Sequence, residues 1–154
     1  MQTERLSLPQ ASPDGYAAVS GVEAYVKRSG LPATLIELVK MRASQINGCA
    51  FCIDMHSKDA RRLGVGEQRL YLLDAWHEST VYTPAERAAL AWTDALTQVA
   101  EKRAPDAHYA ALREHFTDRE IVDLSILIGL INLWNRLAIG MLYSPDADPD
   151  GAAQ

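Results

Sequence analysis

Cysteine is scarce in this chain of 154 residues, which contains only two copies. Two cysteines cannot build the disulfide framework that staples a small secreted domain. Nine glycines and seven prolines are too few for a low-complexity or collagen-like chain. Basic residues are outnumbered, 15 against 20 acidic ones, and the net charge of −5 gives no basic patch for a nucleic-acid partner.

A long uninterrupted apolar run is also missing. The most apolar stretch, 121–143, is interrupted by Asp123 and Arg136, and its charge-free part, 124–135, falls short of the roughly 20 residues that a membrane-spanning helix needs. No apolar segment follows a basic start at the N-terminus, as it would in a secretory signal. We therefore expect a cytoplasmic protein with reduced thiols and no membrane association.

What is present is a chain with 48% hydrophobic residues, spaced mostly at helical intervals. No segment shows the sustained alternation between turn dipeptides that predicts a strand. The sequence therefore predicts an all-α fold of about six or seven helices in a single domain, 1–154, with a core of about 16–143 and loose ends at 8–15 and 144–154. The expected helices cover 16–29, 33–46, 49–63, 67–75, 83–99, 106–116 and 117–141.

Two helix starts are strongly marked. Thr83-Pro84-Ala85-Glu86 combines a capping box with proline at the first helical position, and Thr117 and Glu120 repeat the box. In a capping box the threonine oxygen accepts from a backbone amide, and the glutamate side chain accepts from the amide of the threonine.

The last expected helix is apolar on nearly all sides, which is typical of a helix that is central to the domain or shared between subunits. Asn132, Asn135 and Arg136 lie in it at i, i+3 and i+4. Because buried polar groups need hydrogen-bond partners, we expect these three side chains to form an internal or intersubunit network. Trp92 and Trp134 are expected to be core or interface residues.

The most informative segment is Cys49-x-x-Cys52-x-x-x-His56 at an expected helix start. A helix N-terminus favours a thiolate, which is the reactive form of cysteine. His56 shares a helix face with both cysteines and can exchange a proton with them. A cysteine oxidised to a sulfenic acid also needs a second thiol nearby. The pattern therefore predicts a dithiol redox site.

Two other interpretations of these residues are open. The cysteines could be small buried hydrophobic residues. They could also bind zinc together with His56, with Glu37 or His77 as a fourth ligand, although no second cysteine pair follows. For His77 itself, a helix cap or an interface contact is the simpler expectation.

Taken together, these residues resemble the alkylhydroperoxidase AhpD-like, carboxymuconolactone decarboxylase superfamily. The resemblance rests on Glu37, Cys49, Cys52 and His56 with their spacing, and on the segment around them, and it extends over about 16–143. It implies an AhpD-like helical bundle that assembles into trimers or hexamers. It also implies that Cys52 is the peroxidatic thiol, that Cys49 is the resolving thiol, and that His56 and Glu37 relay protons.

The implied activity is an antioxidant thiol peroxidase that reduces hydrogen peroxide or organic hydroperoxides. Such an enzyme needs no bound cofactor or metal, but an external dithiol, a lipoyl or thioredoxin-like protein, must reduce its disulfide. One departure is Phe51, which stands where the best-known AhpD enzymes have a second histidine. Two alternatives stay open: a cofactor-free lyase or isomerase acting on a carboxylated lactone, and a redox-sensing assembly protein.

Overall fold

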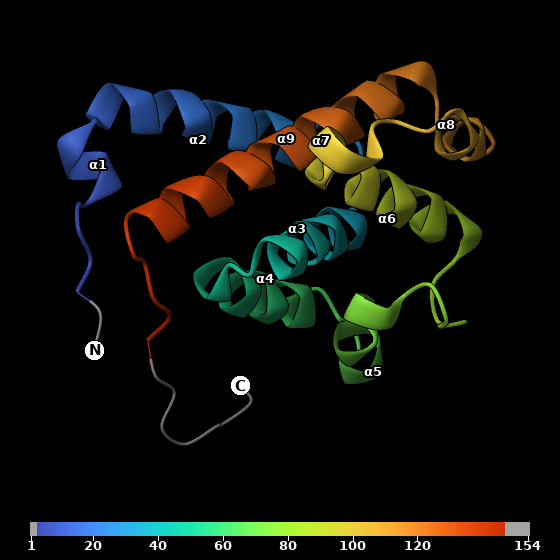
Figure 1. Cartoon of the computed structure of the whole chain (residues 1–154), viewed down its shortest axis with the longest axis horizontal. Helices are drawn as coiled ribbons and strands as arrows, with labels where there is room; N and C mark the ends of the chain where they lie inside the picture. Colours follow the sequence, from blue (N-terminus) through green and yellow to red (C-terminus); the bar gives the residue numbers. More distant parts are fainter. Residues whose placement is uncertain (1–2, 147–154) are drawn as a thin grey trace.

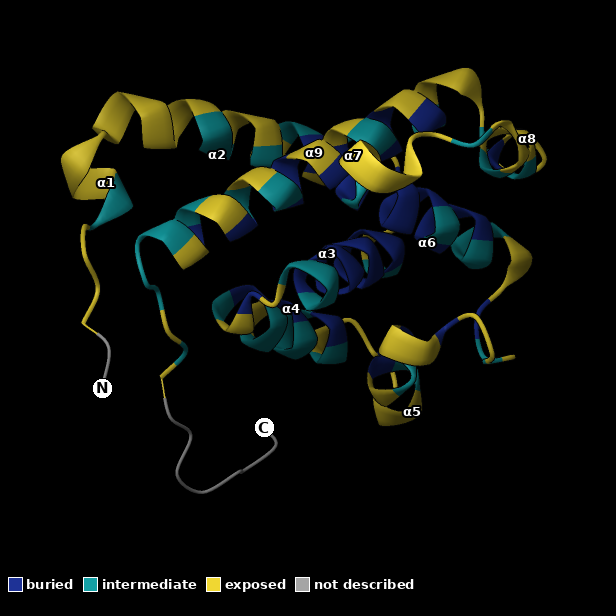
Figure 2. Cartoon of the chain, viewed as in Figure 1, coloured by how far each residue is buried: buried dark blue, intermediate teal, exposed yellow. Residues whose placement is uncertain are grey.

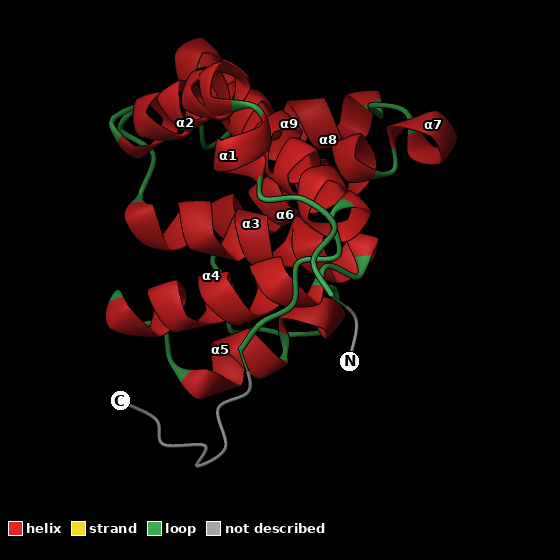
Figure 3. Ribbon diagram, turned by 90° about the vertical axis from the view of Figure 1, so that its left-hand side faces the viewer, coloured by secondary structure: helices red, strands yellow, loops and turns green. Residues whose placement is uncertain are grey.

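The computed structural model describes residues 3–146, and helices are the only regular elements in that part of the chain (Figure 3). This confirms the predicted all-α fold. The elements are α1 (Leu8–Ala11), α2 (Pro13–Lys27), α3 (Ala33–Asn47), α4 (Ala50–Arg62), α5 (Glu67–Tyr71), a 3₁₀ turn (Leu73–Ala75), α6 (Pro84–Thr97), α7 (Val99–Lys102), α8 (Asp106–Arg113) and α9 (Asp118–Gly140).

The N-terminal segment differs from its prediction as a loose end, because 8–15 form α1 and the first turn of α2. Pro9 and Pro13 stand in the first turns of these helices, where the missing N–H has no intrahelical partner to lose. The segment is also attached to the far end of the chain, since the Leu8 amide donates to the Tyr143 hydroxyl at 2.8 Å. At the other end, 144–146 are not helical, and 147–154 lie outside the described residues.

Both predicted capping boxes are confirmed. The Thr83 hydroxyl accepts from the Glu86 amide at 3.2 Å, and the Glu86 carboxylate accepts from the Thr83 amide at 2.8 Å. The Thr117 hydroxyl accepts from the Glu120 amide at 3.3 Å in the same way. These boxes begin α6 and α9, the two long helices of the C-terminal half.

Helix α3 lies in the middle of the molecule, between α4, α6 and α9 (Figure 1), and it is the most deeply buried helix in Figure 2. Every residue from 35 to 44 is buried, including Glu37, Lys40 and Arg42. A buried charge requires a partner. Arg42 Nε donates to Asp94 Oδ1 at 2.6 Å, and Lys40 pairs with Glu23 of α2. Glu37 has its partner in the site described below.

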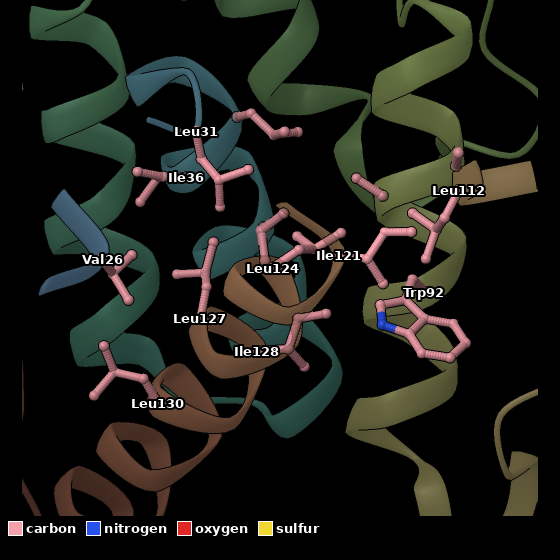
Figure 4. Close-up of a cluster of buried hydrophobic side chains, with 14 residues drawn as sticks. Val26, Leu31, Ile36, Trp92, Leu112, Ile121, Leu124, Leu127, Ile128 and Leu130 are labelled. Atoms are coloured by element: carbon pink, nitrogen blue, oxygen red, sulfur yellow. The ribbon is translucent and has the colours of Figure 1, made fainter. Parts of the chain in front are cut away.

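One face of α9 forms much of the apolar core (Figure 4). Leu124, Leu127 and Ile128 pack there with Ile36 of α3 and Trp92 of α6. Burying each such side chain contributes about 1.5–3 kcal/mol. The core position predicted for Trp92 and the central position predicted for α9 are therefore confirmed.

The opposite face of α9 is exposed and also apolar. It carries Val122, Ile126 and Leu133, of which Val122 is 57% exposed. By length and mean hydropathy, 1.4 over an 18-residue window, α9 resembles a membrane span. However, 56% of that window is buried inside the molecule, as in a core helix.

Candidate active site

The site is built on the hairpin of α3 and α4, which pack along each other (Figure 3). Gly48 joins them with a φ of 68°, a left-handed conformation that glycine adopts without a steric penalty. This confirms the stop signal at Asn47-Gly48. In a helical hairpin, residues at similar distances from the turn face each other, and Glu37 and His56 are such a pair.

The two cysteines occupy the start of α4. Cys49 is the N-cap residue, with extended backbone angles, and Cys52 is the third residue of the helix. Both are free thiols, each 2% exposed. Their spacing is that of a capping box, in which the side chains of the N-cap and third residues lie close together. The structure therefore brings the two sulfurs together, as the sequence predicts.

The two thiols share a proton unequally. A hydrogen bond from the Cys52 thiol lowers the pKa of Cys49 to about 6, and the amides of Cys52 and Phe51 at the helix start act in the same direction. Conversely, the Cys49 thiolate, followed by burial, raises the pKa of Cys52. Near neutral pH the pair therefore carries one negative charge, held at Cys49.

A cavity of about 330 Å³ opens beside the pair. Cys52, His56 and Glu37 line it, whereas Cys49 is not among its lining residues. The two thiols are therefore not equivalent, because a small molecule in the cavity meets Cys52 first. Cys49 lies at the N-terminal end of α4, outside the cavity lining.

His56 and Glu37 form a buried pair in this cavity. His56 Nδ1 lies 2.8 Å from Glu37 Oε2, and the two residues are 5% and 8% exposed. A histidine whose one ring nitrogen is held by a carboxylate has its other nitrogen directed and ready to exchange a proton. Since His56 is one helical turn after Cys52 on α4, the arrangement can move protons between the cavity and Glu37.

Other charged groups surround this pair. Lys40 and Glu23 line the same cavity as an ion pair, and Asp59 lies one turn beyond His56 on α4. Oxygen and nitrogen atoms of Glu37, His56 and Asp59 all lie within 4.8 Å of one another. Among the described residues, this group does not include either cysteine, so the ligand set expected for a Cys49–Cys52 zinc site is not assembled.

The remainder of the cavity wall is apolar and mostly aromatic. Tyr16, Phe51, Trp134 and Tyr143 line it together with Leu8. The ring of Tyr16 meets Trp134 edge-on at 5.8 Å, and Phe51 meets Tyr143 edge-on at 5.5 Å. Phe51 therefore completes an apolar wall and offers no proton-exchanging group at this position. Trp134 is a wall residue rather than only a core residue.

The protein family to which this chain belongs can be assigned by comparing its sequence with known families. A model of the carboxymuconolactone decarboxylase family matches residues 12–95, which include the α3–α4 hairpin and all four candidate residues. The match covers more than half of the chain. This protein belongs to the carboxymuconolactone decarboxylase family.

Two relatives are similar over almost the whole chain. YdfG of Bacillus subtilis, an uncharacterised protein, is 45% identical over 139 residues, which are 90% of this chain and 95% of YdfG. A protein of unknown function from Agrobacterium tumefaciens, described with its crystal structure as a candidate AhpD protein of antioxidant defence, is 49% identical to this chain with a TM-score of 0.91. The match covers 94% of this chain and 100% of the Agrobacterium chain.

A more distant structure shares the fold. The debrominase Bmp8 superposes with a TM-score of 0.81 at 23% identity, over 90% of this chain and 74% of Bmp8. The AhpD-like fold predicted from the sequence is therefore confirmed.

The sequence predicts a hydrogen-bond network of Asn132, Asn135 and Arg136 on α9. The structure shows this network inside the chain. Asn47 Nδ2 donates to Asn132 Oδ1 at 3.0 Å and to Asn135 Oδ1 at 2.9 Å, and Arg136 donates to Asn132. Asn47 is a member that the sequence does not predict, because its place before Gly48 indicates only a helix end. Ser44, which accepts from Asn135, is not predicted either.

His77 lies elsewhere. Its ring stacks on Trp76 with centroids 3.7 Å apart, and its Nε2 lies 3.2 Å from Asp94 Oδ2. The side chain is 61% exposed and does not line the cysteine cavity. Neither the zinc-ligand role nor a helix cap describes it, because its contacts are to the ion pair between Arg42 and Asp94.

Proposed function

We propose that this protein is a thiol-dependent peroxidase that reduces hydrogen peroxide or organic hydroperoxides through Cys49 and Cys52. One observation carries the proposal: Cys52 lines the cavity beside the buried His56–Glu37 pair, while Cys49 lies in the same helical turn with a lowered pKa. This arrangement supports a nucleophile and a proton relay at one cavity, with a resolving thiol beside the nucleophile in the same helical turn.

In the oxidative step, the proton of the Cys52 thiol passes to the Cys49 thiolate, and the Cys52 thiolate formed in this way attacks the terminal peroxide oxygen. The O–O bond breaks, Cys52 becomes a sulfenic acid, and the departing alkoxide takes a proton from protonated His56. Glu37 accepts a hydrogen bond from His56 and stabilises the imidazolium before the transfer. Cys52 is thereby oxidised, and the peroxide is reduced to an alcohol.

In the resolving step, Cys49 gives its proton to His56 and attacks the Cys52 sulfur. The S–O bond breaks, hydroxide leaves as water after taking that proton, and a disulfide forms. The low pKa of Cys49 suits this step, since the thiolate is the attacking form. An external dithiol, which we propose is a lipoyl or thioredoxin-like protein, then reduces the disulfide through Cys52, and Cys49 is the favourable leaving group.

The cavity also favours a class of peroxide. Its wall of Tyr16, Phe51, Trp134 and Tyr143 offers apolar surface next to Cys52, so an organic hydroperoxide gains contacts that hydrogen peroxide lacks. The cycle as written needs no bound cofactor. We place the protein in the cytoplasm, where reductants of this kind keep thiols reduced, and we propose that it assembles as a trimer or hexamer.

The aromatic wall supports a second candidate function, which is the reductive removal of bromine from a halogenated aromatic ring. The debrominase Bmp8, which shares this fold, is named for a reaction of this kind. The Cys52 thiolate would attack the halogen, the ring carbon would take a proton from His56, and Cys49 would displace halide to form the same disulfide. This reaction consumes two thiols, as the peroxidase reaction does, but it releases bromide instead of water.

The test is mass spectrometry of the peptide that contains both cysteines, before and after one equivalent of cumene hydroperoxide. We expect a loss of two hydrogens that a dithiol reverses, and sustained peroxide consumption when dithiothreitol is present. Cys52→Ser should abolish consumption, and Cys49→Ser should allow one turnover and then stop. Full consumption by Cys52→Ser would refute the proposal, and turnover of a carboxylated lactone by a variant lacking both thiols would establish a lyase instead.

A further inference from the structure

Asn135 is an unusual residue for its position. It is 0% exposed in the apolar helix α9, and the residues one turn on either side of it, Ile131 and Ala138, pack against Cys49 and Cys52. Positions 131, 135 and 138 share one helix face. The amide of Asn135 therefore lies on the face of α9 that covers the thiol pair.

The orientation of the Asn135 amide is fixed by a chain of hydrogen bonds that begins at Asn132 and passes through Asn47. Asn132 Nδ2 donates to the Ile128 carbonyl at 2.9 Å, and Arg136 Nη1 donates to Asn132 Oδ1 at 3.1 Å. A carbonyl can only accept and a guanidinium can only donate, so Asn132 has one allowed orientation. Its Oδ1 then requires the amino group of Asn47, which also donates to Asn135 Oδ1 at 2.9 Å.

The amino group of Asn135 consequently faces the other way, toward α3 and the cysteines. One of its N–H groups donates to Ser44 Oγ at 3.0 Å. The Ser44 hydroxyl in turn donates to the Lys40 carbonyl at 2.7 Å, so its hydrogen is already used. Asn135 thus keeps a second N–H on the side of the thiol pair, where the acceptor available to it is sulfur.

We propose that Asn135 is the side-chain donor that stabilises the negative charge of the Cys49–Cys52 pair, and that Asn47 and Asn132 are positioning residues that fix its orientation. The proposal rests on this pair being the reactive site of the proposed function. It goes further by assigning a buried amide of α9, outside the Cys-x-x-Cys-x-x-x-His motif, to the ionisation of the thiols.

The ionisation of the thiols agrees with this geometry. The hydrogen bond between the two sulfurs has the largest effect on both pKa values. The Asn135 amide lowers the pKa of each thiol in addition, and the Ser44 hydroxyl lowers the pKa of Cys52 only. Charged groups on three helices also face the cavity at Cys52, and all of them are unchanged in the variants below: Glu23 and Lys27 of α2, Glu37 and Lys40 of α3, and His56 and Asp59 of α4.

The experiment is a pH titration of thiolate absorbance in the reduced protein, which needs no peroxide. In Asn135→Leu, which keeps the size of the side chain but removes the donor, the first thiol midpoint should rise by about one to two pH units. The rate of alkylation at pH 7 should fall about two- to tenfold, and raising the pH should restore it. Asn132→Ala, which keeps the Asn135 donor but frees its orientation, should give a smaller shift in the same direction.

Ser125→Ala is the matched control, because it removes a partly buried acceptor that the Trp92 indole N–H uses, on the same helix but away from the thiols. It should leave the midpoint unchanged. An unchanged midpoint in folded Asn135→Leu would overturn the proposal, and if that variant does not fold, an unchanged midpoint in Asn132→Ala overturns it. If the midpoints move but peroxide is not consumed, the role of Asn135 stands and the proposed function fails.

Discussion

At the scale of single residues, the site depends on two thiols with the same chemistry but different surroundings. Cys49 is the N-cap of α4, where helix amides and the Cys52 thiol stabilise its charge, and Cys52 lines the cavity. The sequence supplied the spacing of these residues but not this difference, since helix register places both cysteines and His56 on one face. Which thiol meets the cavity depends on α2 and α9, which come from distant segments.

The pair should ionise in two well-separated steps. The pKa of Cys49 is lowered to about 6, so one thiolate per protein should appear as the pH rises through that value and should be lost below it. The second thiol should stay protonated until far higher pH, because the first charge disfavours it. Thiolate absorbance measures both steps, and Cys52→Ala should move the first midpoint upward. A single two-thiol step near the ordinary cysteine pKa would contradict this picture.

Glu37 should matter through His56. Glu37→Gln keeps the size of the side chain but removes the carboxylate that holds His56 Nδ1 at 2.8 Å. We expect the second-order rate constant for hydroperoxide reduction to fall about a hundredfold, a typical contribution of acid–base catalysis. Stopped-flow measurement of Cys52 oxidation would test this.

Asp54→Asn is the control for that variant, because Asp54 is a carboxylate of the same helix that pairs with Lys58 and does not line the cavity. Its rate should match that of the unchanged protein. Equal rates for Glu37→Gln and the unchanged protein would remove Glu37 from the relay.

At the scale of elements, every described helix except α1 and α7 corresponds to a predicted one, including the short helices α5 and α8. Capping boxes, Gly48 and apolar spacing are local signals, and they identified α3, α4, α6 and α9. Helices α1 and α7 have four residues each and no such spacing, so tertiary contacts hold them. The polar network was predicted only in part, because Asn47 contacts residues 85 and 88 positions away.

The cap of α6 gives an element-scale prediction. Thr83→Ala removes the side-chain acceptor for the Glu86 amide and should lower the free energy of unfolding by about 1 kcal/mol. Urea denaturation measures the change. Thr80→Ala, an exposed threonine just before the helix, should change it by less than about 0.5 kcal/mol. Equal effects of the two substitutions would mean that the capping box adds nothing to stability.

At the scale of the whole molecule, the second apolar face of α9 remains exposed to solvent in a single chain. Val122, Ile126 and Leu133 recur at helical spacing on it and are 57%, 36% and 42% exposed. The sequence predicted a helix apolar on nearly all sides, but it could not say which side faces the core. Self-association would cover this row, in agreement with the proposed trimer or hexamer.

That assembly can be tested with one charge. Ile126→Glu should reduce the subunit number, measured by analytical ultracentrifugation, because a carboxylate at the centre of the row opposes its burial. The fold should persist, since this side chain points away from the core. Glu78→Ile, which adds no charge to the row, serves as the control. A protein that is monomeric before any substitution would refute the assembly.

The position of both cysteines in one helical turn has a further consequence for how the protein can be studied. Because the N-cap and the third residue of α4 would be joined within that turn, closing the disulfide requires no displacement of one helix against another. The oxidised and reduced forms should therefore have the same radius of gyration and the same far-ultraviolet circular dichroism. A turnover would be invisible to methods that sense shape, whereas chemical labels, mass or thiolate absorbance would register it.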